Sequence, residues 1–149
     1  ARAELNDADW VFAAGHHPYL SNGKHGNAGA YESIEVAGVS IPNPFDQLDG
    51  NTIKEFFDTY VCGNVDMYFA GHDHDREWID EPEALCGAPM IISGAGGKLR
   101  DFVGTGNATL FQDDTKGGFA YVVVNGSDLT LQFIDADGNV EFEQVISKP

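Results

Sequence analysis

Histidines at the ends of two apolar runs are the residues best suited to chemistry in this sequence. A Gly-His-Asp-His segment at 71–74 follows the apolar run 65–70, and a Gly-His pair at 15–16 follows the apolar run 10–14. Sites in open α/β sheets form at the carboxyl ends of strands, so two such strands would deliver imidazoles to one edge. A lone histidine is more often structural, but this repeated pattern predicts a metal site, since neutral imidazole binds zinc and iron.

The spacing within segment 71–74 predicts how its side chains point. In an extended chain, residues two apart project to the same side, so His72 and His74 should face one cavity while Asp73 points away. We expect Gly71 to let the backbone turn tightly there. With His16, these side chains make three imidazoles but no carboxylate at a recognisable ligand position, so the predicted metal site is incomplete.

Several motifs resemble those of one phosphatase family. They are Gly15-His16-His17-Pro18, Ser21-Asn22-Gly23-Lys24-His25-Gly26 and Gly71-His72-Asp73-His74. In this order they resemble the later motifs of the calcineurin-like metallophosphoesterases, and among these the purple acid phosphatase type. Segments 93–96 and 117–122 also resemble closing segments of that family, so the resemblance covers nearly the whole chain.

The resemblance implies a two-metal site that hydrolyses phosphate monoesters. It makes His16 and His72 ligands of one metal and His74 a ligand of the other. The implied cofactors are two metal ions: iron paired with zinc, manganese or a second iron. His25 would lie beside the substrate phosphate as a hydrogen-bond donor or general acid, a role typically worth ~10²–10⁴ in rate.

Four further residues are candidates for substrate binding. His17 stands where the family accepts His or Tyr and is interpreted as part of the pocket wall rather than as a ligand. Lys24 precedes His25 where the mammalian enzymes carry an acid, and it could contact phosphate. Tyr19 and Asn22 are expected at the pocket rim because they lie in a long loop next to the histidine motifs, although ordinary surface exposure would also explain both.

The aspartate-containing motifs of the family are missing from the sequence. Residues 1–149 are therefore expected to be the C-terminal part of a single metallophosphoesterase domain, whose N-terminal half was lost, was cleaved or is a separate partner chain. Two other readings stay open. The chain could be an inactive fragment or processed product, or the complete protein could be a phosphodiesterase or nucleotidase of the same superfamily.

The composition of the chain limits the classes of molecule that it is expected to bind. The 149 residues are 42% hydrophobic and 11% aromatic, which argues against disorder. The formal net charge of −16 makes binding to nucleic acid or anionic membranes unfavourable, and the same field repels phosphate esters unless local cations dominate at the pocket. The sequence has no apolar run of the ~18 residues that a membrane span needs, so we expect none.

The two cysteines flank the Gly-His-Asp-His segment. Cys62 and Cys86 are each followed by glycine, and a disulfide between them is favoured over two buried free thiols. Because cytosolic compartments disfavour such bonds, an extracellular or periplasmic location is expected.

The predicted fold class is α/β: the C-terminal half of the metallo-dependent phosphatase β-sandwich, flanked by helices and ending in antiparallel strands. A helix is expected at 52–62, with a capping box of Thr52 and Glu55 and an end at Gly63. Strands are expected at 10–14, 65–70, 89–93, 118–124, 129–135 and 140–146. Turns are expected at 125–128 and 135–139, and long loops at 19–50 and 94–117.

Overall fold

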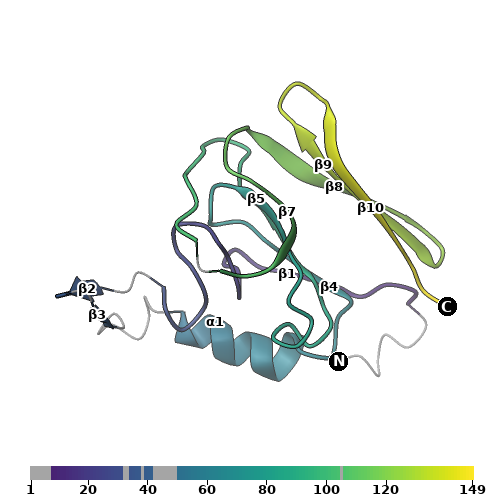
Figure 1. Ribbon diagram of the computed structural model, residues 1–149. Coiled ribbons are helices and arrows are strands. Elements are labelled where there is room, and N and C mark those ends of the chain that lie inside the picture. Colours follow the sequence, from purple (N-terminus) through teal and green to yellow (C-terminus); the bar gives the residue numbers. More distant parts are fainter. Residues whose placement is uncertain (1–7, 32–33, 38, 42–49, 105) are drawn as a thin grey trace.

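A five-stranded sheet carries the ends from which the histidines project. The computed structural model describes residues 8–31, 34–37, 39–41, 50–104 and 106–149. Within them the sheet has the order β1-β4-β6-β5-β7. Its strands are β1 (Phe12–Ala14), β4 (Met67–Ala70), β5 (Arg76–Ile79), β6 (Met90–Ser93) and β7 (Thr109–Asp113). β1, β4 and β6 are neighbours in the sheet and run parallel, so β1 and β4 end at the same edge (Figure 1).

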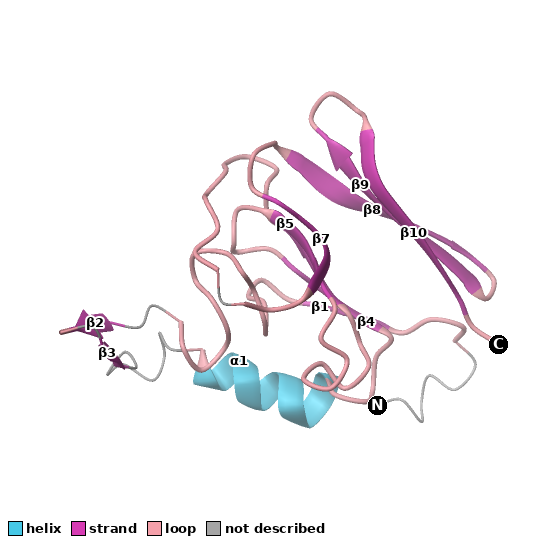
Figure 2. Cartoon of the chain, viewed as in Figure 1, coloured by secondary structure: helices cyan, strands magenta, loops and turns pink. Residues whose placement is uncertain are grey.

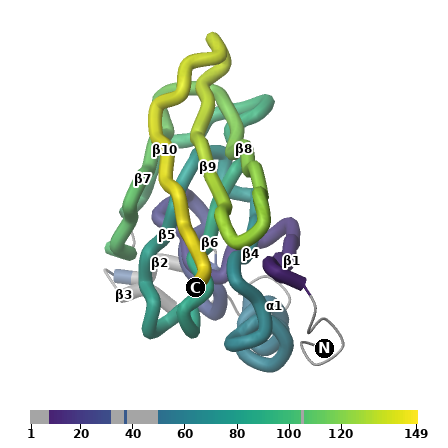
Figure 3. The backbone as a smooth tube through the Cα atoms, turned by 90° about the vertical axis from the view of Figure 1, so that its right-hand side faces the viewer, coloured from purple at the N-terminus to yellow at the C-terminus, as the bar shows by residue number. Residues whose placement is uncertain are grey.

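A second sheet faces the first. It consists of β8 (Gly118–Asn125), β9 (Asp128–Asp135) and β10 (Val140–Ser147), all antiparallel, in the order β10-β9-β8. Seen from the side, it covers the strands of the larger sheet (Figure 3). The three strands and both connecting turns match the predicted tail, and Gly126 and Gly138 take the positive φ that these turns require.

Alternation along the central strands divides the apolar residues between two cores. One core lies between the two sheets and contains Met67, Trp78, Ile91, Leu129, Leu131 and Phe133. The other lies on the helix side of the larger sheet and contains Tyr19, Leu20, Phe57, Val61, Tyr68, Ala70, Ile79, Leu85, Met90 and Ile92. Successive strand residues point to opposite faces, so Met67 and Tyr68 enter different cores. The predicted α/β sandwich is confirmed (Figure 2).

The predicted helix forms, with two corrections. α1 (Asn51–Phe56) continues directly into the wider helical segment η2 (Phe57–Val61). The helix begins at Gly50, which has a left-handed conformation and no side-chain cap, so the expected capping box is wrong. Phe57 and Val61 are buried, but Phe56 and Tyr60 are exposed, so the buried stripe is narrower than the periodicity indicated.

Four strands were not predicted. β5 and β7 lie within the larger sheet, and β7 occupies part of the expected loop 94–117. A small antiparallel pair, β2 (Ile34–Val36) and β3 (Val39–Ile41), lies within the expected loop 19–50, of which 32–33, 38 and 42–49 are outside the described residues.

A buried arginine joins the two sheets. Arg76 on β5 is 0% exposed, and its Nη2 lies 2.6 Å from a carboxylate oxygen of Asp113 on β7 and 2.6 Å from one of Glu141 on β10. Its guanidinium also lies over the ring of Phe111, with 5.7 Å to the ring centre. A buried charge is tolerated only when it is paired, so this ion pair fixes how β10 sits on the larger sheet.

Cys62 and Cys86 form the predicted disulfide, with their Cα atoms 5.3 Å apart, so the alternative of two free thiols is wrong. The bond ties the end of η2 to the turn before β6. Among the described residues, the helices are too short or too polar to cross a membrane.

Candidate metal centre

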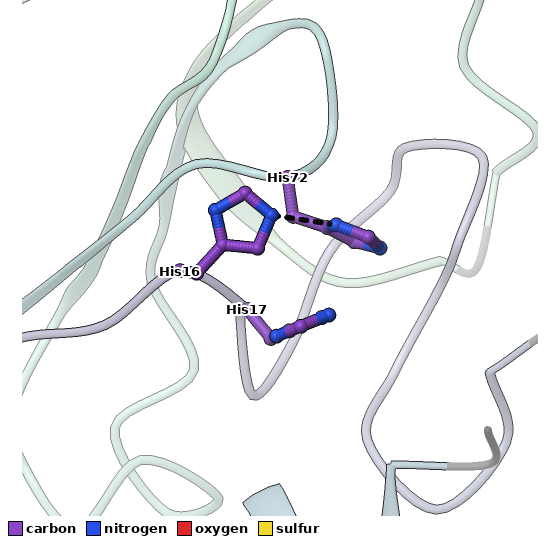
Figure 4. A group of neighbouring side chains, drawn as sticks. All are labelled: His16, His17 and His72. Atoms are coloured by element: carbon purple, nitrogen blue, oxygen red, sulfur yellow. Dashed lines mark hydrogen bonds between the residues drawn. The ribbon is translucent and has the colours of Figure 1, made fainter. Parts of the chain in front are cut away.

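Three imidazoles meet at the edge where β1 and β4 end. Nε2 of His16 lies 3.1 Å from Nδ1 of His72 (Figure 4). One ring nitrogen from each of His16, His17 and His72 lies within 4.8 Å of the other two. Backbone hydrogen bonds bring the two segments together past the strand ends. The amide of Gly15 donates to the carbonyl of Phe69, and the amide of Gly71 donates to the carbonyl of His16.

The loop that carries His72 is not extended. His72 has a φ of 66°, a left-handed conformation that non-glycine residues seldom adopt, whereas Gly71 is not among the positive-φ residues. The chain does turn tightly here, with the amide of Asp73 donating to the carbonyl of Gly71, but the left-handed residue of the turn is His72 and not the glycine. Strand alternation does not apply after β4 ends at Ala70, so it cannot be used to orient His72 and His74.

Burial favours the neutral form of two of these imidazoles, His72 and His17. Desolvation, followed by the nearby rings of His25 and His17, lowers the pKa of His72 to about 4. Desolvation and His16 also lower the pKa of His17. A neutral imidazole has a lone pair free for a metal, so these two side chains are in the form that binds cations near neutral pH.

His74 lies apart from this group. It is half-buried, and its ligand atoms are not among those that gather around His16, His17 and His72. Its Nδ1 is buried without a hydrogen-bond partner. Burial, followed by Arg100 and Lys98, lowers its pKa. A buried nitrogen without a partner is costly, and binding a second ion would supply the missing contact.

His25 lies against His72, with 4.1 Å between ring centres. Nη1 of Arg100 lies 2.9 Å from Nε2 of His25. Because a guanidinium only donates hydrogen bonds, Nε2 of His25 is the acceptor in this contact, and Nδ1 carries the proton in the neutral ring. The prediction that His25 donates to a phosphate therefore refers to Nδ1.

Three buried acids beneath the histidines were not recognised in the sequence as part of the site. Asp73, Asp75 and Glu77 are all 0% exposed. Asp73 accepts hydrogen bonds from the Ser21 hydroxyl (2.5 Å) and the His25 amide (3.0 Å). Glu77 accepts from the Ser21 hydroxyl and from the Asn22 amide. Strand alternation gave no signal for them, because Asp73 and Asp75 lie in the bends before β5 and all four residues of β5 are buried.

Mutual repulsion keeps part of this acid cluster protonated. Burial, with Glu77 and Asp73 nearby, raises the pKa of Asp75, and burial raises the pKa of Glu77 to about 7. The Asp75 carboxyl lies near enough to Glu77 to share a hydrogen bond when one of the two is protonated, and otherwise its oxygens have no partner. Buried carboxyl groups this close cannot all ionise, so the cluster holds protons at neutral pH.

The four predicted substrate-binding residues are in different environments. Lys24 is exposed, and His17 is half-buried with its ring stacked near Tyr31. Tyr19 is in the core instead of at a pocket rim: its ring stacks on Phe57, and its hydroxyl bonds with Asp58 and Lys54.

Asn22 lines a pocket, but its side chain is largely engaged within the fold. It is 5% exposed, and its side-chain amide donates to the carbonyl of Asn107 and to Gln112. Tyr19 therefore packs in the core, whereas Asn22 lines a pocket with Phe102 and Asn107 and stays a candidate for substrate binding.

The geometry of the cluster fits a metal ion only in part. Two nitrogen ligands bound to one ion at roughly 2.0–2.1 Å lie about 3 Å apart, which is close to the 3.1 Å between His16 and His72. Within the described residues, however, this cluster consists of imidazoles alone. A two-metal centre with hard cations would also need oxygen ligands.

Comparison with solved structures shows that the fold occurs in another protein. GAP50, described as the anchor in the inner membrane complex of Plasmodium, has the same fold over 99% of this chain and 41% of its own, with a TM-score of 0.58 at 18% identity. No protein-family model matches the chain.

Sequence comparison leads to particular relatives. The chain is 27% identical to tartrate-resistant acid phosphatase type 5 of Homo sapiens over 91% of its length, and 26% identical to that of Oryctolagus cuniculus over 99%. It spans only 37% and 41% of those two relatives. The resemblance to the purple acid phosphatase type, predicted from the motifs, is confirmed.

Proposed function

We propose that this chain supplies the histidine ligands of a two-metal centre that hydrolyses phosphate monoesters. The observation that carries the proposal is the 3.1 Å approach of Nε2 of His16 to Nδ1 of His72 at the adjoining ends of two parallel strands. The acid phosphatase relatives support the same chemistry. In this proposal His16 and His72 hold one metal, and the unpartnered Nδ1 of His74 faces the second.

The chain's own residues would position the phosphate. When bound, a pair of metals clamps the attacking and leaving oxygens of an in-line displacement. His25 would donate its Nδ1 proton to a phosphoryl oxygen or to the leaving alkoxide, with Arg100 fixing the orientation of the ring. His17 would form the wall of the pocket next to His16.

The missing oxygen ligands are proposed to come from outside residues 1–149. β1 is an edge strand in the described part of the sheet, and Phe12 on it is 40% exposed. Further strands could pair with this edge, directly beside His16, and bring carboxylates to the histidines. On this proposal the chain is the C-terminal part of one domain. The disulfide supports an extracellular or periplasmic location.

One experiment tests the metal site and the missing part together. Intact mass spectrometry of the purified sample would establish whether a second polypeptide accompanies the chain. Metal analysis and hydrolysis of an aryl phosphate would then be measured for the chain alone and after adding an N-terminal segment from a related acid phosphatase. We expect weak metal binding alone and turnover only with the added segment. A chain that binds no metal in either state would overturn the proposal.

The second candidate is a chain that hydrolyses nothing. It is favoured by the absence of carboxylates from the described histidine cluster, since three imidazoles do not hold two hard cations firmly. Under this reading the added segment restores neither metal binding nor turnover. If the isolated chain turned over at ordinary enzyme rates, roughly 1–10³ per second, both the incomplete-site argument and this candidate would fail.

A further inference from the structure

The basic residues of the described chain fall into two groups. Four of them form ion pairs with carboxylates: Lys54 with Asp58, Arg76 with Asp113 and Glu141, Lys116 with Asp135 and Glu141, and Lys148 with Asp66. The other three in the described ranges, Lys24, Lys98 and Arg100, take part in none of the ion pairs found there. A chain with a net charge of −16 thus leaves three cations without a carboxylate partner.

These three cations line one pocket. Its volume is about 650 Å³, inside the range of roughly 300–1,000 Å³ usual for small-molecule sites. The remaining lining residues are Leu99, Asp101, Phe102 and Val103. Asp101 is thus the single acid in the lining of this pocket, so the local charge is positive in a strongly negative protein.

The pocket adjoins the histidine site. Lys24 is next to His25 in sequence, and Nη1 of Arg100 contacts Nε2 of His25 at 2.9 Å. The amide of Arg100 donates to the carbonyl of His74 at 3.1 Å. The loop with Lys98 and Arg100 follows β6, whose carboxyl end lies at the same sheet edge as those of β1 and β4.

The backbone at and after Arg100 is held in place. The amide of Val103 donates to the carbonyl of Asn22, and the amide of Phe102 donates to the carboxylate of Asp114 at 2.7 Å. A fixed backbone limits the entropy lost when an anion binds beside Arg100.

We propose that Lys24, Lys98 and Arg100 form an anion subsite that selects phosphate esters carrying a second phosphate group on the leaving side. Arginine offers a planar fork that matches phosphate oxygens, and two lysines add point charges that balance a multiply charged group. This inference rests on the proposed function, which puts the phosphate that is hydrolysed at the histidines. The second phosphate would then lie in the pocket, on the far side of His25.

The test uses binding, which requires no hydrolysis. Pyrophosphate and inorganic phosphate are titrated calorimetrically into the 149-residue chain in metal-free buffer with a chelator. The double variant Lys24→Gln with Lys98→Gln removes two cations but leaves the contact of Arg100 with His25. Lys116→Gln is the matched control, because it removes a similarly exposed lysine that does not line this pocket and pairs with Asp135 and Glu141 instead.

We expect the unmodified chain and the control to bind pyrophosphate about tenfold more tightly than phosphate, with affinity that falls as salt is added. Each removed charge should weaken pyrophosphate binding about two- to fivefold, so the double variant loses most of the preference. Thermal unfolding of the double variant should match that of the unmodified chain, because Lys24 and Lys98 are exposed and take part in none of the ion pairs of the described residues.

Two outcomes would overturn the subsite. One is equal affinity for the two anions in the unmodified chain, and the other is unchanged pyrophosphate binding in the double variant. Citrate that binds as tightly as pyrophosphate, with the same dependence on Lys24 and Lys98, would overturn the assignment to phosphate. If pyrophosphate binds as expected while the chain with its added segment hydrolyses no ester, the subsite stands and the proposed function fails.

Discussion

The backbone amide of His25 donates a 3.0 Å hydrogen bond to Oδ1 of Asp73. Asp73 stands between the two histidines of its loop, and its other oxygen accepts a 2.5 Å hydrogen bond from the Ser21 hydroxyl. One buried carboxylate therefore joins the loop of His72 and His74 to the loop of His25. The Asp73 side chain therefore sets where the proposed metal ligands His72 and His74 lie relative to His25, the proposed general acid.

Replacing Asp73 with alanine should destabilise the fold. It would remove the shorter of the two hydrogen bonds of the Ser21 hydroxyl, which keeps Glu77 as an acceptor, and the hydrogen bond from the His25 amide, at a cost of about 1–3 kcal/mol. The midpoint of thermal unfolding should fall by several degrees, about 2–4 °C for each kcal/mol. The exposed Asp80→Ala variant serves as control and should unfold close to the unmodified chain. Equal midpoints in the two variants would contradict the linking role of Asp73.

Substitutions at His72 and His25 should separate metal binding from turnover. In a reconstituted enzyme, His72→Ala should lower both metal content and phosphatase activity, because it removes a proposed ligand. His25→Ala should lower turnover by ~10²–10⁴ and leave metal content nearly unchanged. Metal analysis and an aryl phosphate assay on the same samples would decide between them. Equal metal loss in both variants would make His25 a ligand.

Breaking the disulfide should cost about 3 kcal/mol of folding free energy. The bond closes a loop with a sequence separation of 24, and closing such a loop reduces the entropy of the unfolded chain. The double variant Cys62→Ser with Cys86→Ser should therefore unfold at lower urea concentration than the oxidised chain. Adding reductant should shift the unmodified chain in the same direction and leave the double variant unchanged. A variant as stable as the oxidised chain would show that the bond contributes nothing.

The buried acid cluster should make the fold more stable at mildly acidic pH. Burial raises the pKa of Glu77 from 4.5 to about 7, so the folded state binds more protons than the unfolded state between these values. The contribution of Glu77 to the free energy of unfolding is therefore fully present below about pH 4.5, and it is lost as the pH rises through 7. Urea unfolding at pH 5 and pH 8 measures the difference, which we expect to be about 1–3 kcal/mol.

Glu77→Gln provides the matched variant for this pH dependence. A glutamine keeps an oxygen for the Asn22 amide and can donate its NH₂ toward Asp75, whose oxygens otherwise have no partner. The variant should be more stable than the unmodified chain at pH 8 and should show a smaller difference between pH 5 and pH 8, the remainder coming from Asp75, whose pKa burial also raises. A difference of undiminished size in Glu77→Gln would show that Glu77 does not contribute to it.

Local patterns predicted those elements whose own residues carry the signal. The helix at 51–61 and the strands β8, β9 and β10 repeat apolar residues at helical or alternating spacing, with glycine at the turns. β5 was missed because it begins with Arg76 and Glu77, which are charged residues that a single sequence gives no reason to bury. They become buried strand residues only because Asp113 and Glu141 pair with the arginine and Ser21 and Asn22 bond the glutamate.

By itself, the sequence determined the α/β class, the disulfide between Cys62 and Cys86 and the phosphatase-like motifs, because residue type and spacing along the chain carry each of these. Only the tertiary structure decided which side chains meet. It placed His72 in a left-handed conformation beside His16, buried the acid cluster under the site, and gathered Lys24, Lys98 and Arg100 around one pocket. Such contacts join segments far apart in sequence, so no local period encodes them.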